Sequence, residues 1–171
     1  MRAPRHNRPM EHTFIFQPGV WKASGTFWTA DGRALEAEGR SEVSHAKECW
    51  MIAGKLRVLA SPPVEFVNIY CMSPPSKDAF TSKWTMENAT LGKLHGFYSI
   101  VGPAIMSFYR SENGGYQGSE HLLQIDADRY DAYGMLLMED RRLSSWRVEL
   151  RREPASGPSA VAEHPTANHR A

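Results

Sequence analysis

The sequence predicts an all-β protein that forms a single antiparallel, up-and-down β-barrel of about ten strands. Short runs rich in Val, Ile, Phe, Tyr, Trp and Thr recur along the chain, and turn residues separate them about every ten positions. Helical periodicity is nearly absent. Ten strands in an open sheet would leave two unpaired edges, so a closed barrel is favoured over its alternative, an antiparallel sandwich.

Each strand is expected between two turn signals. The approximate ranges are 19–29, 34–45, 47–58, 64–73, 79–87, 93–101, 104–111, 116–125, 130–138 and 143–152. The breaks contain residues that reverse a chain: Asp31-Gly32, Ser61-Pro-Pro63, Ser73-Pro-Pro-Ser76, Gly102-Pro103, Asn113-Gly114, Asp126–Asp128 and Glu139–Arg142. Because the loops are short, strands that follow one another in the sequence are expected to pair in the sheet.

Asn113-Gly114 is the turn from which the register can be worked out. It suits a two-residue type I′ hairpin, in which both central residues adopt positive φ. Side chains alternate between the two faces of a strand, so this hairpin places Ser107 opposite Glu120. A two-residue loop at Gly102-Pro103 likewise places Tyr98 opposite Ser107.

Tyr98, Ser107 and Glu120 thus form a row around the barrel. Even loops at Ala127-Asp128 and Asp140-Arg141 extend this row to Met135 and Trp146. The face that contains it is predicted to line the lumen: Tyr98, Ile100, Ile105, Ser107, Tyr109, Glu120, Leu122, Tyr133, Met135, Leu137, Trp146, Val148 and Leu150. The opposite face of the last strand carries Arg147, Glu149 and Arg151, so it is expected to be exposed to solvent. A single bulge or odd loop would reverse every later assignment, and could turn His121 inward in place of Glu120.

Composition places this chain among single-domain globular proteins. It has 171 residues with 20 basic and 19 acidic side chains, so its charge predicts binding to neither nucleic acid nor a membrane surface. No run approaches the roughly 20 apolar residues of a membrane-spanning helix. Residues 1–12 and 153–171 are expected to be disordered tails around a barrel domain at 13–152.

Cys49 and Cys71 are too few for a disulfide framework. Their apolar surroundings favour two buried, reduced thiols over a Cys49–Cys71 bridge, and no secretory signal is convincing. The protein is therefore expected in the cytoplasm.

Gly19-Val20-Trp21 opens the first strand, and Trp146–Arg151 forms the last. This pairing resembles the calycin barrels, the lipocalins and fatty-acid-binding-like proteins, and most closely bacterial lipocalin-like domains without assigned function. The resemblance implies that Arg151 or Arg147 crosses Trp21, and that the lumen is a ligand cavity rather than a filled core. The tight turn at Asp31-Gly32 leaves no room for the helical lid of fatty-acid-binding proteins.

Glu120 is the candidate for chemistry. Burial in an apolar lumen raises the pKa of a carboxyl toward neutrality, where it can act as general acid or base. The structural alternatives are that it holds a buried partner or sits at a wet barrel mouth. The predicted ligand-binding residues around it are Tyr98, Ser107, Tyr109, Leu122, Tyr133, Met135 and Trp146.

The function predicted from these residues is the binding of a small, largely apolar ligand in the lumen. An isomerase or cyclase that uses Glu120 is the first alternative, and a filled structural or dimerisation module is the second. His45, His95 and His121 match no metal motif, so neither a metal nor a cofactor is predicted. Met106, Phe108, Leu123, Leu136 and Met138 fall on the outer face, where an apolar stripe is typical of a homodimer interface.

Overall fold

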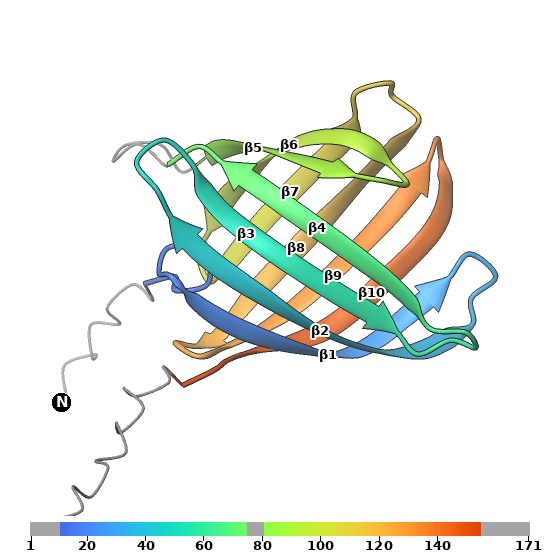
Figure 1. The fold of residues 1–171 in the computed structure, drawn as a ribbon, viewed down its shortest axis with the longest axis horizontal. Coiled ribbons are helices and arrows are strands. Elements are labelled where there is room, and N and C mark those ends of the chain that lie inside the picture. Colours follow the sequence, from blue (N-terminus) through green and yellow to red (C-terminus); the bar gives the residue numbers. More distant parts are fainter. Residues whose placement is uncertain (1–10, 75–80, 155–171) are drawn as a thin grey trace, which may run out of the picture.

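The predicted barrel is confirmed. A computed structural model describes residues 11–74 and 81–154, in which ten antiparallel strands form one closed sheet (Figure 1). The strands are β1 (Gly19–Thr29), β2 (Ala34–His45), β3 (Trp50–Val58), β4 (Val64–Met72), β5 (Thr81–Asn88), β6 (Gly92–Val101), β7 (Ala104–Ser111), β8 (Tyr116–Asp126), β9 (Arg129–Met138) and β10 (Arg141–Arg152). β3 begins later than predicted because Ala46 N–H donates to Cys49 O at 3.1 Å and closes a turn.

The sheet closes through β1, which pairs with β2 on one side and with β10 on the other. Trp21 therefore lies between Ser41 and Arg152. All other strands pair with their neighbours in sequence. The closed sheet has no unpaired edge strand. Avoiding such edges is the reason that a barrel was predicted rather than an open sheet.

The register predicted from β6 to β8 is confirmed, although the type I′ turn is wrong. Ser107 lies opposite both Tyr98 and Glu120. Gly114 has a φ of 75°, but Asn113 does not adopt positive φ. Instead, Tyr116 N–H donates to Ser111 Oγ at 2.9 Å, and Gly115 N–H donates to Asn113 Oδ1 at 3.1 Å. A four-residue loop held by these side chains preserves the same even register.

Two bulges change the predicted register, one before β9 and one near the start of β10. The first lies at Ile125, between Gln124 and Asp126, and places Gly134 rather than Met135 opposite Glu120. The second lies at Leu143 and restores the predicted face of β10. A bulge adds one residue to one strand and so exchanges the faces of the strand that follows.

The bulge at Ile125 turns Tyr133 and Met135 outward, where they are 42% and 41% exposed. Phe108 and Leu123 are exposed as predicted. Leu136, predicted outside, lines the interior. The predicted interior position of Leu137 is also wrong, because it alternates with Leu136 along β9.

One end of the barrel is closed by the segment that precedes β1. Phe14 and Ile15 are buried, and the ring of Phe14 meets Trp21 edge-on at 5.2 Å between centroids. His12 Nε2 lies 3.0 Å from Gly102 O, and Thr13 N–H donates to Tyr130 Oη at 2.8 Å. The packed segment thus begins before residue 13. The rest of the predicted N-terminal tail, residues 1–10, lies outside the described residues.

At the other boundary, Glu153 N–H donates to Val20 O at 2.8 Å, so the ordered chain continues past residue 152. Residues 155–171 of the predicted C-terminal tail lie outside the described residues.

The basic residue over Trp21 is Arg152, and the expectation of Arg151 or Arg147 is wrong. Arg152 Cζ lies 5.7 Å from the Trp21 ring centroid. Arg147 instead contacts Asp131 and Tyr133, and Arg151 pairs with Glu149. Arg152 lies on the inward face of β10 with Leu150 and Val148, because the bulge at Leu143 sets that face.

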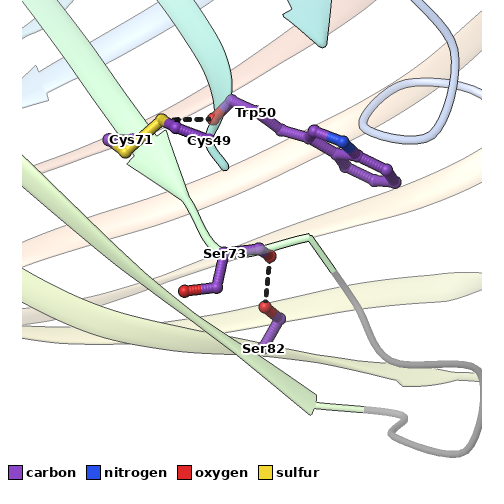
Figure 2. Close-up of a disulfide and its surroundings, with 5 residues drawn as sticks. All are labelled: Cys49, Trp50, Cys71, Ser73 and Ser82. Carbon is purple, nitrogen blue, oxygen red and sulfur yellow. Dashed lines mark hydrogen bonds between the residues drawn. A yellow bond between two sulfur atoms is a disulfide. The ribbon is translucent and has the colours of Figure 1, made fainter. Parts of the chain in front are cut away.

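The expectation of two reduced thiols is also wrong, because Cys49 and Cys71 form a disulfide (Figure 2). Their Cα atoms lie 5.7 Å apart, and Cys71 is on the exposed face of β4. Cys49 precedes Trp50, whose ring stacks on His45 with centroids 3.9 Å apart. Disulfides persist mainly in oxidising compartments, so the cysteines no longer support the cytoplasmic expectation.

Within residues 11–74 and 81–154, no helix has the length and apolar character needed to cross a membrane.

Candidate functional site: a cavity in the barrel lumen

The lumen contains a cavity of about 250 Å³. Its floor is Phe14 and Ile15 of the closing segment, and its mouth lies at the opposite end near Thr90 and Leu91. The lining is mostly apolar and aromatic. This volume is slightly below the roughly 300–1,000 Å³ that is usual for drug-sized ligands. The lumen is therefore not a filled core, which contradicts the filled-barrel alternative.

Three aromatic side chains on one wall each lie across a glycine of the neighbouring strand. Trp84 on β5 lies over Gly96, where an added Cβ would be 2.7 Å from the indole. Tyr109 on β7 lies over Gly118, and Trp146 on β10 lies over Gly134. The absence of a Cβ lets each ring lie flat against the sheet and reach the strand beyond.

The polar group of each ring donates a hydrogen bond to the strand beyond the glycine. Trp84 Nε1–H donates to Ser107 Oγ at 2.9 Å, and Tyr109 Oη–H donates to Met135 O at 3.0 Å. Trp146 Nε1–H donates to Glu120 Oε1 at 3.2 Å. Buried Trp and Tyr side chains usually require such partners, so these three bonds fix how the rings are oriented in the wall.

Glu120 faces the cavity from β8 and is half-buried. Burial raises the pKa of its carboxyl above the ordinary value of 4.5, and the bond from Trp146 partly offsets this effect. Burial also raises the pKa of Tyr70 and Tyr109, and in both the nearby Glu120 charge adds to the effect. The carboxyl and the two phenols all line the cavity.

The facing wall, on β1 to β3, includes three small residues. Ala23, Ser41 and Gly54 line the cavity there. A Cβ added at Gly54 would have no atom closer than Ser41 Oγ at 3.4 Å, so this glycine borders empty space. The cavity exists because small side chains on this wall face large rings on the other.

Phe27 and Phe66 narrow the mouth. Their strands, β1 and β4, are not neighbours, yet the rings stack with centroids 5.8 Å apart. Polar atoms also reach the lumen here, because Asn88 Nδ2 donates to Asn68 Oδ1 at 2.9 Å.

Six of the eight predicted site residues line the cavity: Tyr98, Ser107, Tyr109, Glu120, Leu122 and Trp146. Tyr133 and Met135 do not, because the bulge at Ile125 turns them outward. His121 is also outside, where its ring meets Phe108 at 5.9 Å. Glu120 receives its hydrogen bond from Trp146, and Ser107 receives one from Trp84. Tyr98 Oη has no hydrogen-bond partner among the described residues.

Sequence reasoning missed Asn68 on β4 and Gly54 on β3. Asn68 alternates with exposed Val67 and Ile69, a period-two signal that identifies one face but not which face is lumenal. Gly54 carried no signal, because a glycine in a strand is also typical of bulges and close backbone contacts.

No three His, Cys, Asp or Glu side chains in the described parts of the chain gather closely enough to hold a metal ion.

Comparison of the sequence with protein families and with curated proteins finds no match. Among solved structures, the chain is similar to the S-type phycobiliprotein lyase from Guillardia theta, with a TM-score of 0.58 and 7% sequence identity. The similarity covers 81% of this chain and 89% of the lyase chain. At this identity it concerns the fold alone, and it agrees with the predicted calycin-like barrel.

Proposed function

We propose that this protein binds a small, largely apolar molecule in the barrel lumen, as a carrier related to bacterial lipocalin-like domains. The observation that carries the proposal is the cavity of about 250 Å³, lined mostly by apolar and aromatic side chains. A packed interior contains few voids larger than a water molecule, so a space of this size is unusual unless something occupies it.

The decisive experiment fills the cavity. Gly54→Leu adds a side chain at a position where nothing lies within 3.4 Å of the added Cβ. We expect it to weaken binding of a neutral apolar probe, neopentylbenzene, by about tenfold or more in isothermal titration calorimetry. Gly54→Ala is the matched control and should retain most of the affinity. Equal affinity of the wild type and Gly54→Leu would contradict binding in the lumen.

The natural ligand can be sought directly. Native mass spectrometry of the purified protein should show a bound mass in the wild type that is absent from Gly54→Leu. A bound mass present in both proteins would place that molecule outside the lumen.

An acid/base enzyme on the same scaffold is the second candidate. It is favoured by the raised pKa of Glu120 beside an open cavity, and by the buried Tyr98 Oη, which has no partner among the described residues and could orient a substrate. In this case Glu120→Gln should abolish turnover of the lumenal ligand and leave its affinity within about tenfold. Turnover that survives this substitution would contradict the enzyme proposal.

The homodimer remains a proposal. It is supported by exposed apolar side chains on the outer faces of β6 to β9, which include Phe97, Phe108, Leu123 and Met135. Phe108→Glu is expected to shift the mass measured by light scattering from two chains to one. A wild type that already runs as one chain would contradict the dimer.

A further inference from the structure

The carboxyl of Glu120 faces the lumen without a cation from the chain. Lys55 is the only basic residue that borders the cavity among those described, and its Nζ lies 2.8 Å from Glu65 Oε2 on the outer face. The partner of Glu120 is the neutral indole N–H of Trp146, which engages Oε1 alone. A buried carboxylate normally requires a charged partner or several hydrogen bonds.

An aromatic cluster lies beside this carboxyl. Tyr70 and Trp84 meet edge-on with centroids 5.2 Å apart, and Trp84 and Tyr109 are 5.8 Å apart. Glu120 lies opposite Ser107 on β7, and Ser107 accepts the hydrogen bond from Trp84. Tyr109 lies two residues further along the same face of β7, so the carboxyl is next to the cluster. The faces of such rings carry negative potential and attract cations, most strongly where water is excluded.

We propose that the lumenal ligand is an organic cation, a protonated or quaternary amine on a small apolar body, with its nitrogen between Glu120 and the Tyr70–Trp84–Tyr109 cluster. This proposal rests on ligand binding in the lumen. The same groups would repel a carboxylate or phosphate. A neutral hydrocarbon would leave the carboxyl without a charged partner.

The proposal makes the affinity depend on pH through Glu120. Besides Lys55, the other titratable groups that line the cavity are Tyr70 on β4, Tyr98 on β6 and Tyr109 on β7. Burial raises the pKa of each phenol, which keeps all three neutral at and below neutral pH. β9 and β10 contribute Gly134, Ala132 and Trp146, which do not titrate. A cation favours the ionised carboxyl, so its affinity should fall as the pH is lowered through the pKa of Glu120.

Two probes of the same shape separate charge from apolar contact. Benzyltrimethylammonium carries a charge that does not change with pH, and neopentylbenzene has carbon in place of its nitrogen. Glu120→Gln keeps the shape and an oxygen acceptor for Trp146. By calorimetry, we expect it to weaken benzyltrimethylammonium binding by about tenfold or more, and to change neopentylbenzene binding by less than about threefold. Glu87→Gln, on the exposed face of β5, should affect neither probe.

The outcomes distinguish the two proposals. If neopentylbenzene binds and Glu120→Gln leaves benzyltrimethylammonium binding unchanged, the cation proposal is overturned while lumenal binding stands. If neither probe binds the wild type, both proposals fail. If Gly54→Leu binds benzyltrimethylammonium as tightly as the wild type does, the cation site is not in the lumen.

The wild-type protein supplies a test that needs no substitution at Glu120. Its affinity for benzyltrimethylammonium should decrease on acidification from pH 8 to pH 5, while its affinity for neopentylbenzene stays within about threefold. Equal pH profiles for the two probes would overturn the proposal.

Discussion

Trp146 on β10 reaches Glu120 on β8 across Gly134 of the intervening strand, with 3.2 Å between Nε1 and Oε1. The two residues are two strands apart, so the contact depends on the missing side chain at Gly134. It holds the only lumenal carboxyl of the described chain in a fixed position at the aromatic wall. The enzyme proposal and the organic-cation proposal both depend on this position.

Glu120→Gln should stabilise the folded protein, and the gain should depend on pH. Burial raises the folded-state pKa above 4.5, so the folded protein binds the proton more tightly than the unfolded chain. The contribution of Glu120 to stability is therefore fully present below about pH 4.5 and is lost as the pH rises through the raised pKa. Urea unfolding should show the variant more stable than the wild type at pH 8, and nearly equal to it at pH 4.

Glu87→Gln is the control for this comparison, because Glu87 is exposed. It should not change the pH dependence of unfolding. If Glu120→Gln gains as much stability at pH 4 as at pH 8, burial of the carboxylate charge is not the cause of the stabilisation.

Gly134→Ala should destabilise the barrel and displace Trp146. An added Cβ would overlap the indole ring, which must then rotate and lose its bond to Glu120. Overpacking of this kind costs about 1–3 kcal/mol in the free energy of unfolding. Gly54→Ala introduces the same methyl group into open space and should cost far less. If both variants lose the same stability, strand propensity rather than the contact with Trp146 explains the loss.

Reduction of the Cys49–Cys71 disulfide should lower the free energy of unfolding by about 2–4 kcal/mol, because the bridge closes a loop between residues 22 apart in sequence. Urea titrations with and without reductant measure this difference. Thiol titration of the denatured protein should find no free thiol before reduction and two afterwards. Two free thiols in the untreated protein would show that the bridge does not form in solution.

The strands and the register from β6 to β8 could be predicted because turn residues encode them directly. Gly102 and Gly114 adopt positive φ, which few other residues tolerate, and both lie in loops with an even number of residues. The bulges at Ile125 and Leu143 have no such signature, because any residue can occupy a bulge. Tyr133 and Met135 were therefore assigned to the wrong face.

Contacts between distant residues were the other part that sequence could not supply. His12 is polar and near the N-terminus, and only the structure places it beside Gly102 at 3.0 Å. Cys49 and Cys71 become a pair because β3 lies beside β4. The spacing of two cysteines along the chain does not determine their separation in space.

Arg152→Ala should destabilise the closed end of the barrel. Besides lying over Trp21, the Arg152 guanidinium donates to Gln17 Oε1 at 2.8 Å and to Pro18 O at 2.9 Å. These contacts tie the last strand to the segment that enters the first, so we expect the free energy of unfolding to fall by about 1–3 kcal/mol.

Arg151→Ala is the matched control for Arg152→Ala, because the two residues are adjacent on β10 and point to opposite faces. The Arg151 side chain is 62% exposed and pairs only with Glu149 among the described residues, an interaction worth at most about 1 kcal/mol. Urea unfolding should therefore rank wild type and Arg151→Ala together, above Arg152→Ala. Fluorescence should also report the change, because loss of the guanidinium exposes Trp21, which is fully buried in the wild type. The reverse order of stability would mean that Arg152 does not hold the closing segment, and that the apolar contacts of Phe14 and Ile15 alone close this end of the barrel.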